Sequence, residues 1–165
     1  MNILVSACLM GANCRFDGIP RSYPSMEILA KGGDKLFPFC PECAAGLPTP
    51  RLRAECQGNM VVTEAMEDVT SFFELGAMKA LEVAMEHQCT IAILKERSPS
   101  CGCGLIYDGS FSGNLVEGMG VTAKRLVQAG IFILGESALE NYLNKPRIQN
   151  QQGISSHQYP RFTAR

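Results

Sequence analysis

Histidine is scarce in this chain of 165 residues, and its scarcity excludes several kinds of site. Only two histidines are present: His87 falls on a predicted helix and His157 in a polar C-terminal tail. A metal site that needs several imidazole ligands is therefore excluded by number. A Ser-His-Asp or Cys-His catalytic arrangement would depend on one of these two poorly placed side chains.

The chain also lacks a strong charge bias and a long apolar run. Its 15 Lys and Arg residues nearly balance 16 Asp and Glu residues, so the net charge of −1 provides no broad basic field for a polyanion. No apolar run approaches the roughly 20 residues of a membrane helix. The N-terminal MNILVSACLM has no charged region before its short apolar stretch, so we expect no secretory signal and a cytoplasmic protein.

Cysteine, in contrast, is abundant, with eight residues in the chain. Without an export signal, metal binding, redox chemistry or catalysis explains them better than a disulfide framework does. Because imidazole is so scarce, sulfur is expected to dominate any ligand set. A soft metal centre, either zinc or iron–sulfur, fits that requirement.

Predicted strands and helices alternate along the chain. Buried strands are expected at 2–7, 35–39, 90–95 and 131–134, a smaller strand at 59–64, helices at 23–33, 68–88, 120–130 and 137–143, and loops at 8–18, 40–51 and from 95 to about 118. This alternation predicts an α/β fold, a single domain with a mostly parallel sheet flanked by helices in a Rossmann-like three-layer arrangement. We place the domain at 1–145 and the polar tail at 146–165.

Three cysteines follow predicted strands. Cys8 comes directly after the first strand, Cys40 directly after the second, and Cys101 lies in the loop after TIAILK. The carboxyl ends of parallel strands meet at one edge of a sheet, where ligand sites form. We therefore expect these three sulfurs, which are distant in the sequence, to converge.

The other cysteines have weaker cases. Cys14 shares the first loop and is the natural fourth candidate, whereas Cys56 and Cys89 are expected to be small buried apolar residues. Cys43 belongs to the CPEC motif and Cys103 to CGC, and together these motifs could form a Cys₄ zinc site. Against that alternative, CGC is one residue shorter than the usual zinc knuckle, and CPEC lacks the usual glycine.

Three long motifs resemble the DUF523 family, which includes the thiouracil desulfurases. They are LVSACLMGANCRFDG, FCPECAAGLPTPR and AILKERSPSCGCGLIYDGSFSGNLVEGMGVTA, and the resemblance covers nearly all of residues 2–135. It implies a non-redox desulfurase that carries a [4Fe-4S] cluster held by only three cysteines. The fourth iron would then be free to bind the sulfur of a thiolated pyrimidine.

The resemblance also implies a ligand set. Its motifs identify Cys8, Cys40 and Cys101 as the cluster ligands and assign Cys14 to loop structure or to the surroundings of the site. The second cysteines of CPEC and CGC lie outside the family pattern. A fourth thiolate from either motif would block the open iron.

Polar residues beside these cysteines are candidates for catalysis. Glu42, two residues from Cys40, is expected to act as general acid and base. The Ser98 hydroxyl is expected to orient water or to bind the tetrahedral intermediate, and Ser100 competes with it as a substrate-binding residue. The simpler alternatives are an exposed carboxylate and turn serines that satisfy backbone N–H groups.

Charged residues in the same motifs could hold the substrate. Arg15 and Asp17 of CRFDG, together with Arg51, could bind a base or a phosphate, although ion pairs are the simpler alternative. Lys95 and Glu96 are expected to form a salt-bridged strand terminus. A free thiolated base, a nucleoside or nucleotide and a thiolated tRNA all stay open as substrates. A zinc-stabilised binding module and a redox-sensing protein with a fully ligated cluster are the alternative functions.

Overall fold

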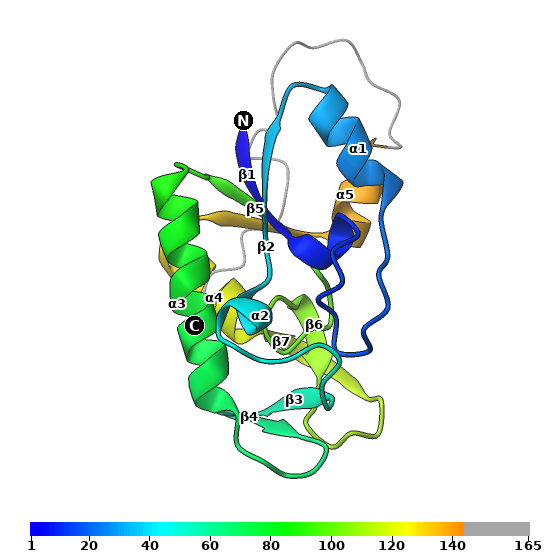
Figure 1. Ribbon diagram of the computed structural model, residues 1–165, viewed down its shortest axis with the longest axis vertical. Coiled ribbons are helices and arrows are strands. Elements are labelled where there is room, and N and C mark those ends of the chain that lie inside the picture. Colours follow the sequence, from blue (N-terminus) through cyan, green and yellow to red (C-terminus); the bar gives the residue numbers. More distant parts are fainter. Residues whose placement is uncertain (144–165) are drawn as a thin grey trace.

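A computed structural model describes residues 1–143 and contains a four-stranded parallel sheet (Figure 1). The strand order is β2-β1-β5-β8, with β1 at Asn2–Ser6, β2 at Lys35–Phe39, β5 at Ile91–Leu94 and β8 at Phe132–Gly135. All four strands were predicted from their apolar runs. The predicted tail at 146–165, its boundary after residue 145 and His157 lie outside the described residues.

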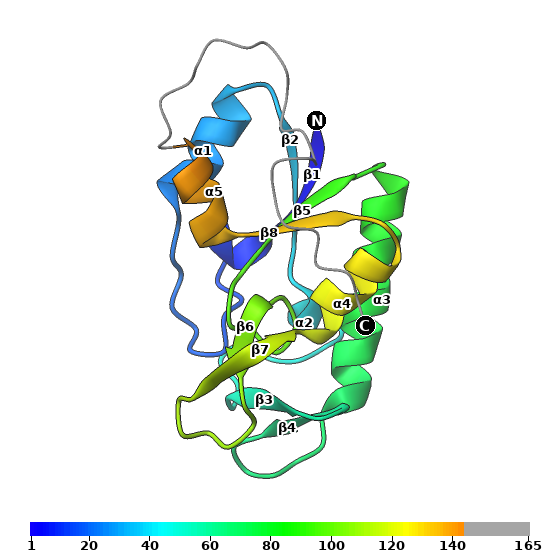
Figure 2. The same cartoon turned by 180° about the vertical axis from the view of Figure 1, so that it is seen from behind.

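Side chains alternate across the sheet and produce two separate cores. Ile3 and Val5 face one side, where they pack with residues of α1 (Pro24–Lys31) and α5 (Glu136–Leu143). Leu4 faces the other side, where the core includes residues of α3 (Thr70–Glu86) and α4 (Val121–Gln128). Figures 1 and 2 show these helix pairs on opposite faces of the sheet. The predicted three-layer α/β domain is therefore confirmed.

Two hairpins extend the molecule beyond the ends of the parallel strands. β3 (Ala54–Gln57) pairs with β4 (Met60–Thr63), and β6 (Cys103–Tyr107) pairs with β7 (Leu115–Met119). β4 was predicted from the sequence, whereas β6 and β7 fall within a predicted loop. Both strands contain a glycine and are only partly buried, so neither shows a clear apolar alternation. In Figures 1 and 2 the hairpins lie past the carboxyl ends of β1, β2 and β5.

The chain order creates a switch point at that edge of the sheet. β1 lies between β2 and β5, so the chain continues from β1 to one neighbour and later returns to the other. Open α/β sheets bind ligands at such points, outside the carboxyl ends of the strands. The loops after β1, β2 and β5 therefore face the hairpins. Among residues 1–143, no helix is long and apolar enough to cross a membrane.

Candidate active site

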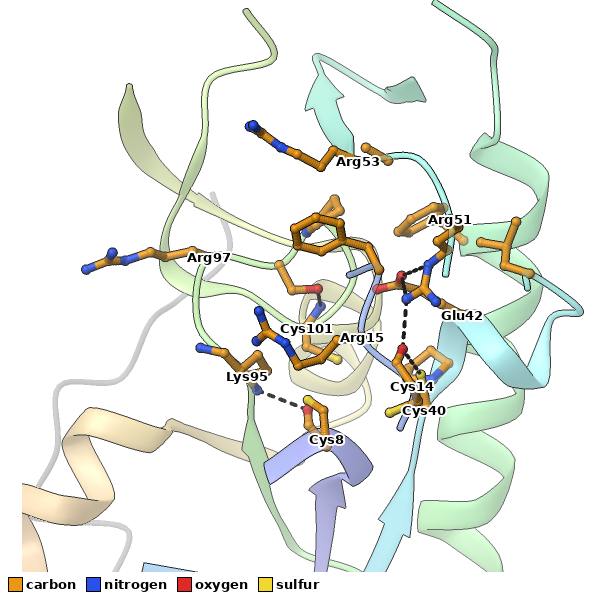
Figure 3. Close-up of a pocket in the computed structure, with 18 of the residues that line it drawn as sticks. Cys8, Cys14, Arg15, Cys40, Glu42, Arg51, Arg53, Lys95, Arg97 and Cys101 are labelled. Carbon is orange, nitrogen blue, oxygen red and sulfur yellow. Dashed lines mark hydrogen bonds and ion pairs between the residues drawn. The ribbon is translucent and has the colours of Figure 1, made fainter. Parts of the chain in front are cut away.

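A cavity of about 670 Å³ lies at the switch point, between the strand ends and the hairpins. Its walls include four cysteines from three loops, namely Cys8, Cys14, Cys40 and Cys101 (Figure 3). The convergence predicted for the three strand-end cysteines is therefore present in the fold. Cys14 joins them as a fourth sulfur in the wall.

Local structure fixes each of the three strand-end cysteines. Cys8 lies in the short helical turn η1 (Ala7–Leu9), which begins immediately after β1. Cys40 is the N-cap residue of α2 (Pro41–Ala44), whose proline at the first position suits a helix start. The loop before Cys101 is held by Ser98, whose Oγ accepts the backbone N–H of Cys101 at 3.1 Å. α2 falls within the predicted loop at 40–51, because prolines interrupt that segment of the sequence.

Cys14 is buried and central to the cysteine group. Its carbonyl oxygen accepts S–H from Cys40 at 3.8 Å and from Cys43 at 3.9 Å, and N–H from Nη2 of Arg51 at 3.0 Å. Side-chain contact with Cys40 lowers the pKa of Cys14, but contact with Cys8 and burial raise it, to about 12 overall. The loop that carries Cys14 is therefore tied to the start of α2.

Cys40 and Cys101 are also held in the thiol form by their surroundings. Contact with Cys14 and burial raise the pKa of Cys40, and burial raises the pKa of Cys101 to about 12. Thiols in such an environment ionise when a bound cation supplies compensating positive charge. Within residues 1–143, no three His, Cys, Asp or Glu side chains form a group that could hold one metal ion.

The other four cysteines are absent from the residues that line the cavity. Cys43 lies near Oγ1 of Thr49, at 3.5 Å. Cys103 begins β6 opposite Met119, and burial raises its pKa to about 12. Cys56 donates its S–H to the carbonyl of Pro99 at 3.5 Å, and Cys89 belongs to the core that packs against α3 and α4.

Glu42 and Arg51 form an ion pair in the cavity wall. Nε of Arg51 donates to Oε2 of Glu42 at 2.8 Å, and Nη2 contacts the same oxygen. The guanidinium also donates to the carbonyls of Cys14 and Pro48 and to Oγ1 of Thr49. Arg51 is fully engaged, so it acts as a clamp on Glu42 instead of the base or phosphate ligand that the sequence suggested.

The two serines of the SPSC segment have different positions. Ser98 lines the cavity, and its Oγ accepts the backbone N–H groups of Ser100 and Cys101, both at 3.1 Å. Ser100 is fully buried, with its hydroxyl 2.8 Å from Oγ1 of Thr122. The prediction that Ser100 binds substrate is therefore corrected, because its hydroxyl faces α4 and pairs there.

Arg15 and Asp17 bind each other in a bidentate pair. Nε of Arg15 donates to Oδ1 of Asp17 at 3.1 Å, and Nη2 donates to Oδ2 at 2.9 Å. The hydrogen bonds from Arg15 lower the pKa of Asp17 to about 2. Arg15 lines the cavity, whereas Asp17 is absent from its lining and orients the guanidinium.

The cavity wall contains further charged residues. Glu55 and Arg53 were not identified from the sequence, whereas Lys95 and Glu96 were expected to form an ion pair at a strand end. Glu55 is 1% exposed and pairs with Arg53 at 3.1 Å. Lys95 pairs with Glu136 at the start of α5, and Glu96 accepts the backbone N–H of Ser137 at 3.1 Å. The expected ion pair at the end of β5 is therefore present, with a partner 41 residues away.

Comparison with known proteins identifies the family of this chain. The family model described as 2-thiouracil desulfurase matches residues 3–138. A protein of Bacillus subtilis (strain 168) named "Uncharacterized protein YbbK" is 42% identical over 153 residues, covering 86% of this chain and 99% of that protein. The solved structure of the [4Fe-4S]-dependent thiouracil desulfidase TudS is 44% identical with a TM-score of 0.79, covering 85% of this chain and 93% of TudS. The chain belongs to the 2-thiouracil desulfurase family.

Proposed function

We propose that this protein hydrolyses the C=S bond of a thiolated uracil with the help of a [4Fe-4S] cluster. Water supplies the oxygen of the product, and the sulfur leaves as hydrosulfide with no net change in oxidation state. The observation that carries the proposal is the presence of Cys8, Cys40 and Cys101 in one cavity, from three separate strand ends. Family membership and the likeness to TudS support it.

Cys8, Cys40 and Cys101 are the proposed ligands, and the chemistry of this donor set fits an iron–sulfur cluster. All are sulfur donors, and the cavity extends beyond them into space that a substrate can enter. When bound, a cluster with three protein ligands supplies a soft Lewis acid that polarises the thiocarbonyl group. Cys14 is proposed to support the loop, because its carbonyl is bonded to the thiols of α2 and to Arg51.

Glu42 is proposed to move the protons. Both contacts from Arg51 fall on Oε2, and Oε1 accepts no hydrogen bond from the described residues. That oxygen can take a proton from water as it attacks the ring carbon and return the proton to the departing sulfur. Ser98 uses its lone pairs to accept two backbone N–H groups, so its own hydrogen can be donated to water or to the developing oxyanion.

The proposed substrates include the thiolated base, its nucleoside and its monophosphate. A cavity of about 670 Å³ falls within the roughly 300–1,000 Å³ of sites for drug-sized ligands. Exposed Arg21 and Arg97 form part of its wall, and neither makes an ion pair within residues 1–143. A thiolated tRNA finds less support, because the net charge of −1 provides no broad basic surface. The cytoplasm is the proposed location.

Anaerobic reconstitution with iron and sulfide, followed by turnover assays, tests this function. About four irons per chain and release of hydrosulfide from 2-thiouracil, 4-thiouridine or its monophosphate are the expected results. A colourless protein that binds zinc tightly would favour the binding module. A stable cluster without hydrosulfide release from any of the three would favour the redox-sensing alternative.

A further inference from the structure

Glu55 of β3 is buried in the cavity wall, although the proposed reaction does not use it. Its Oε1 accepts Nη2 of Arg53 at 3.1 Å. Its Oε2 accepts the backbone N–H groups of Gly109 at 3.1 Å and Phe111 at 3.0 Å. Both oxygens are occupied by donors, which argues against proton transfer. A buried carboxylate bonded in this way instead fixes the groups that donate to it.

The next two residues of β3 bind the same distant segment. Nε2 of Gln57 donates to the carbonyl of Gly109 at 2.5 Å, and the thiol of Cys56 donates to the carbonyl of Pro99 at 3.5 Å. The close contact between β3 and this segment requires glycine at position 109. Its φ is +86°, and an added Cβ would lie 2.6 Å from the carbonyl oxygen of Cys56. We call Glu55, Cys56 and Gln57 the β3 clip.

The β3 clip joins two walls of the cavity that are far apart in the sequence. β3 follows Arg51, the residue that holds Glu42. The segment that the clip binds, 99–111, follows Ser98 and contains Cys101. In Figure 3, Arg53 marks the β3 side of the cavity, across from Cys8. The clip therefore connects the strand that follows Arg51, the ion-pair partner of Glu42 on α2, with the segment that follows Ser98.

We infer that Glu55 is a positioning residue that sets the separation between the Glu42 wall and the Ser98 wall. The inference rests on the proposed function, since it assumes that these two side chains act on one substrate. Without the clip, each wall stays attached to its own strand end, but their relative position loosens. Reactions that need two aligned groups are sensitive to displacements of about 1 Å, which can cost about a hundredfold in rate.

Glu55→Gln tests the inference, because it keeps the shape, removes the charge and turns an NH₂ group toward N–H donors. Hydrogen exchange at the amides of 109 and 111 should rise about tenfold or more relative to β1 and β5. Iron content should stay unchanged, KM should stay within about threefold, and kcat should fall about tenfold or more. Glu74→Gln, on an exposed position of α3, is the matched control and should change none of these.

Two results would overturn the inference. Hydrogen exchange that rises equally across the parallel sheet would mean a general loss of stability. Faster exchange confined to the amides of 109 and 111, together with an unchanged kcat, would show that Glu55 has no positioning role. If Glu55→Gln does not fold, Gln57→Ala removes one bond of the same clip and must show the same local pattern. Exchange is measured without substrate, so a wild-type protein that releases no hydrosulfide would refute the proposed function separately.

Discussion

Replacement of Gly76 by alanine separates two opposing effects of one methyl group. Gly76 is buried in the middle of α3, where helix propensity alone favours alanine by about 1 kcal/mol. The neighbouring helix α2 opposes the change. An added Cβ would overlap the carbonyl oxygen of Pro41 and lie 2.8 Å from its carbonyl carbon. The sign of the stability change therefore shows whether the packing of α3 against α2 requires glycine.

The expected magnitude follows from what the methyl group meets. Overpacking a core costs about 1–3 kcal/mol, and the upper end applies here because a backbone carbonyl cannot move aside by changing rotamer. After subtraction of the propensity gain, we expect Gly76→Ala to destabilise the fold by about 2 kcal/mol. For a domain of this size, that corresponds to a fall in Tm of about 4–8 °C. Pro41 follows Cys40, so iron incorporation should fall as well.

Urea unfolding of the cluster-free protein measures this change directly. Ser71→Ala, at an exposed position of the same helix, is the control and should change the free energy of unfolding by no more than about 0.5 kcal/mol. A Gly76→Ala protein that is as stable as the wild type, or more stable, would refute the packing argument. Iron content of the same variant then shows whether α2 positions Cys40.

Five further substitutions test the site and its surroundings. Cys101→Ser should lose the iron of the reconstituted protein, whereas Cys103→Ser should retain about four irons per chain by metal analysis. Glu42→Gln should keep the iron and lower kcat about a hundredfold or more. Arg51→Lys should also keep the iron and lower kcat about tenfold, because an ammonium group cannot reproduce the two contacts that the planar guanidinium makes with Glu42. Pairing with Arg15 lowers the pKa of Asp17 from 3.8 to about 2, so the ionised carboxylate stabilises the fold above pH 3.8. This contribution is lost as the pH falls to about 2 and the carboxylate is protonated. Asp17→Asn should flatten that part of the stability profile in urea unfolding.

The sequence was sufficient for the parts of the fold that are governed by continuous apolar runs. β1 and β5 are buried on both faces, so their residues form short apolar segments that can be recognised without knowledge of their neighbours. The β6–β7 hairpin is only partly buried, and glycines interrupt its pattern. It was missed because its stability depends on the pairing of β6 with β7 and on contacts of β6 with β3 and β8, and not on a local signal.

Two polar residues of the site show why side-chain roles were harder to predict. Ser100, one residue before Cys101, resembles a substrate-binding serine in the sequence, yet its partner is Thr122 on α4. Glu55 looks like an ordinary exposed acid in a short strand, but its partners are backbone N–H groups 54 and 56 residues later. Partners this distant in the sequence leave no local signal, so neither role could be inferred before the fold was known.

Paired charges in the cavity wall show how the site combines rigidity with room for substrate. Four of its cations bind a carboxylate, in the pairs Arg15–Asp17, Arg51–Glu42, Arg53–Glu55 and Lys95–Glu136. Buried charges need such partners, and each pair then holds its own segment in place. Within the described residues, the cations without an ion pair in the cavity wall are exposed Arg21 and Arg97. We therefore propose that the paired side chains of the wall align the reacting groups, and that the exposed arginines attract any anionic part of a substrate.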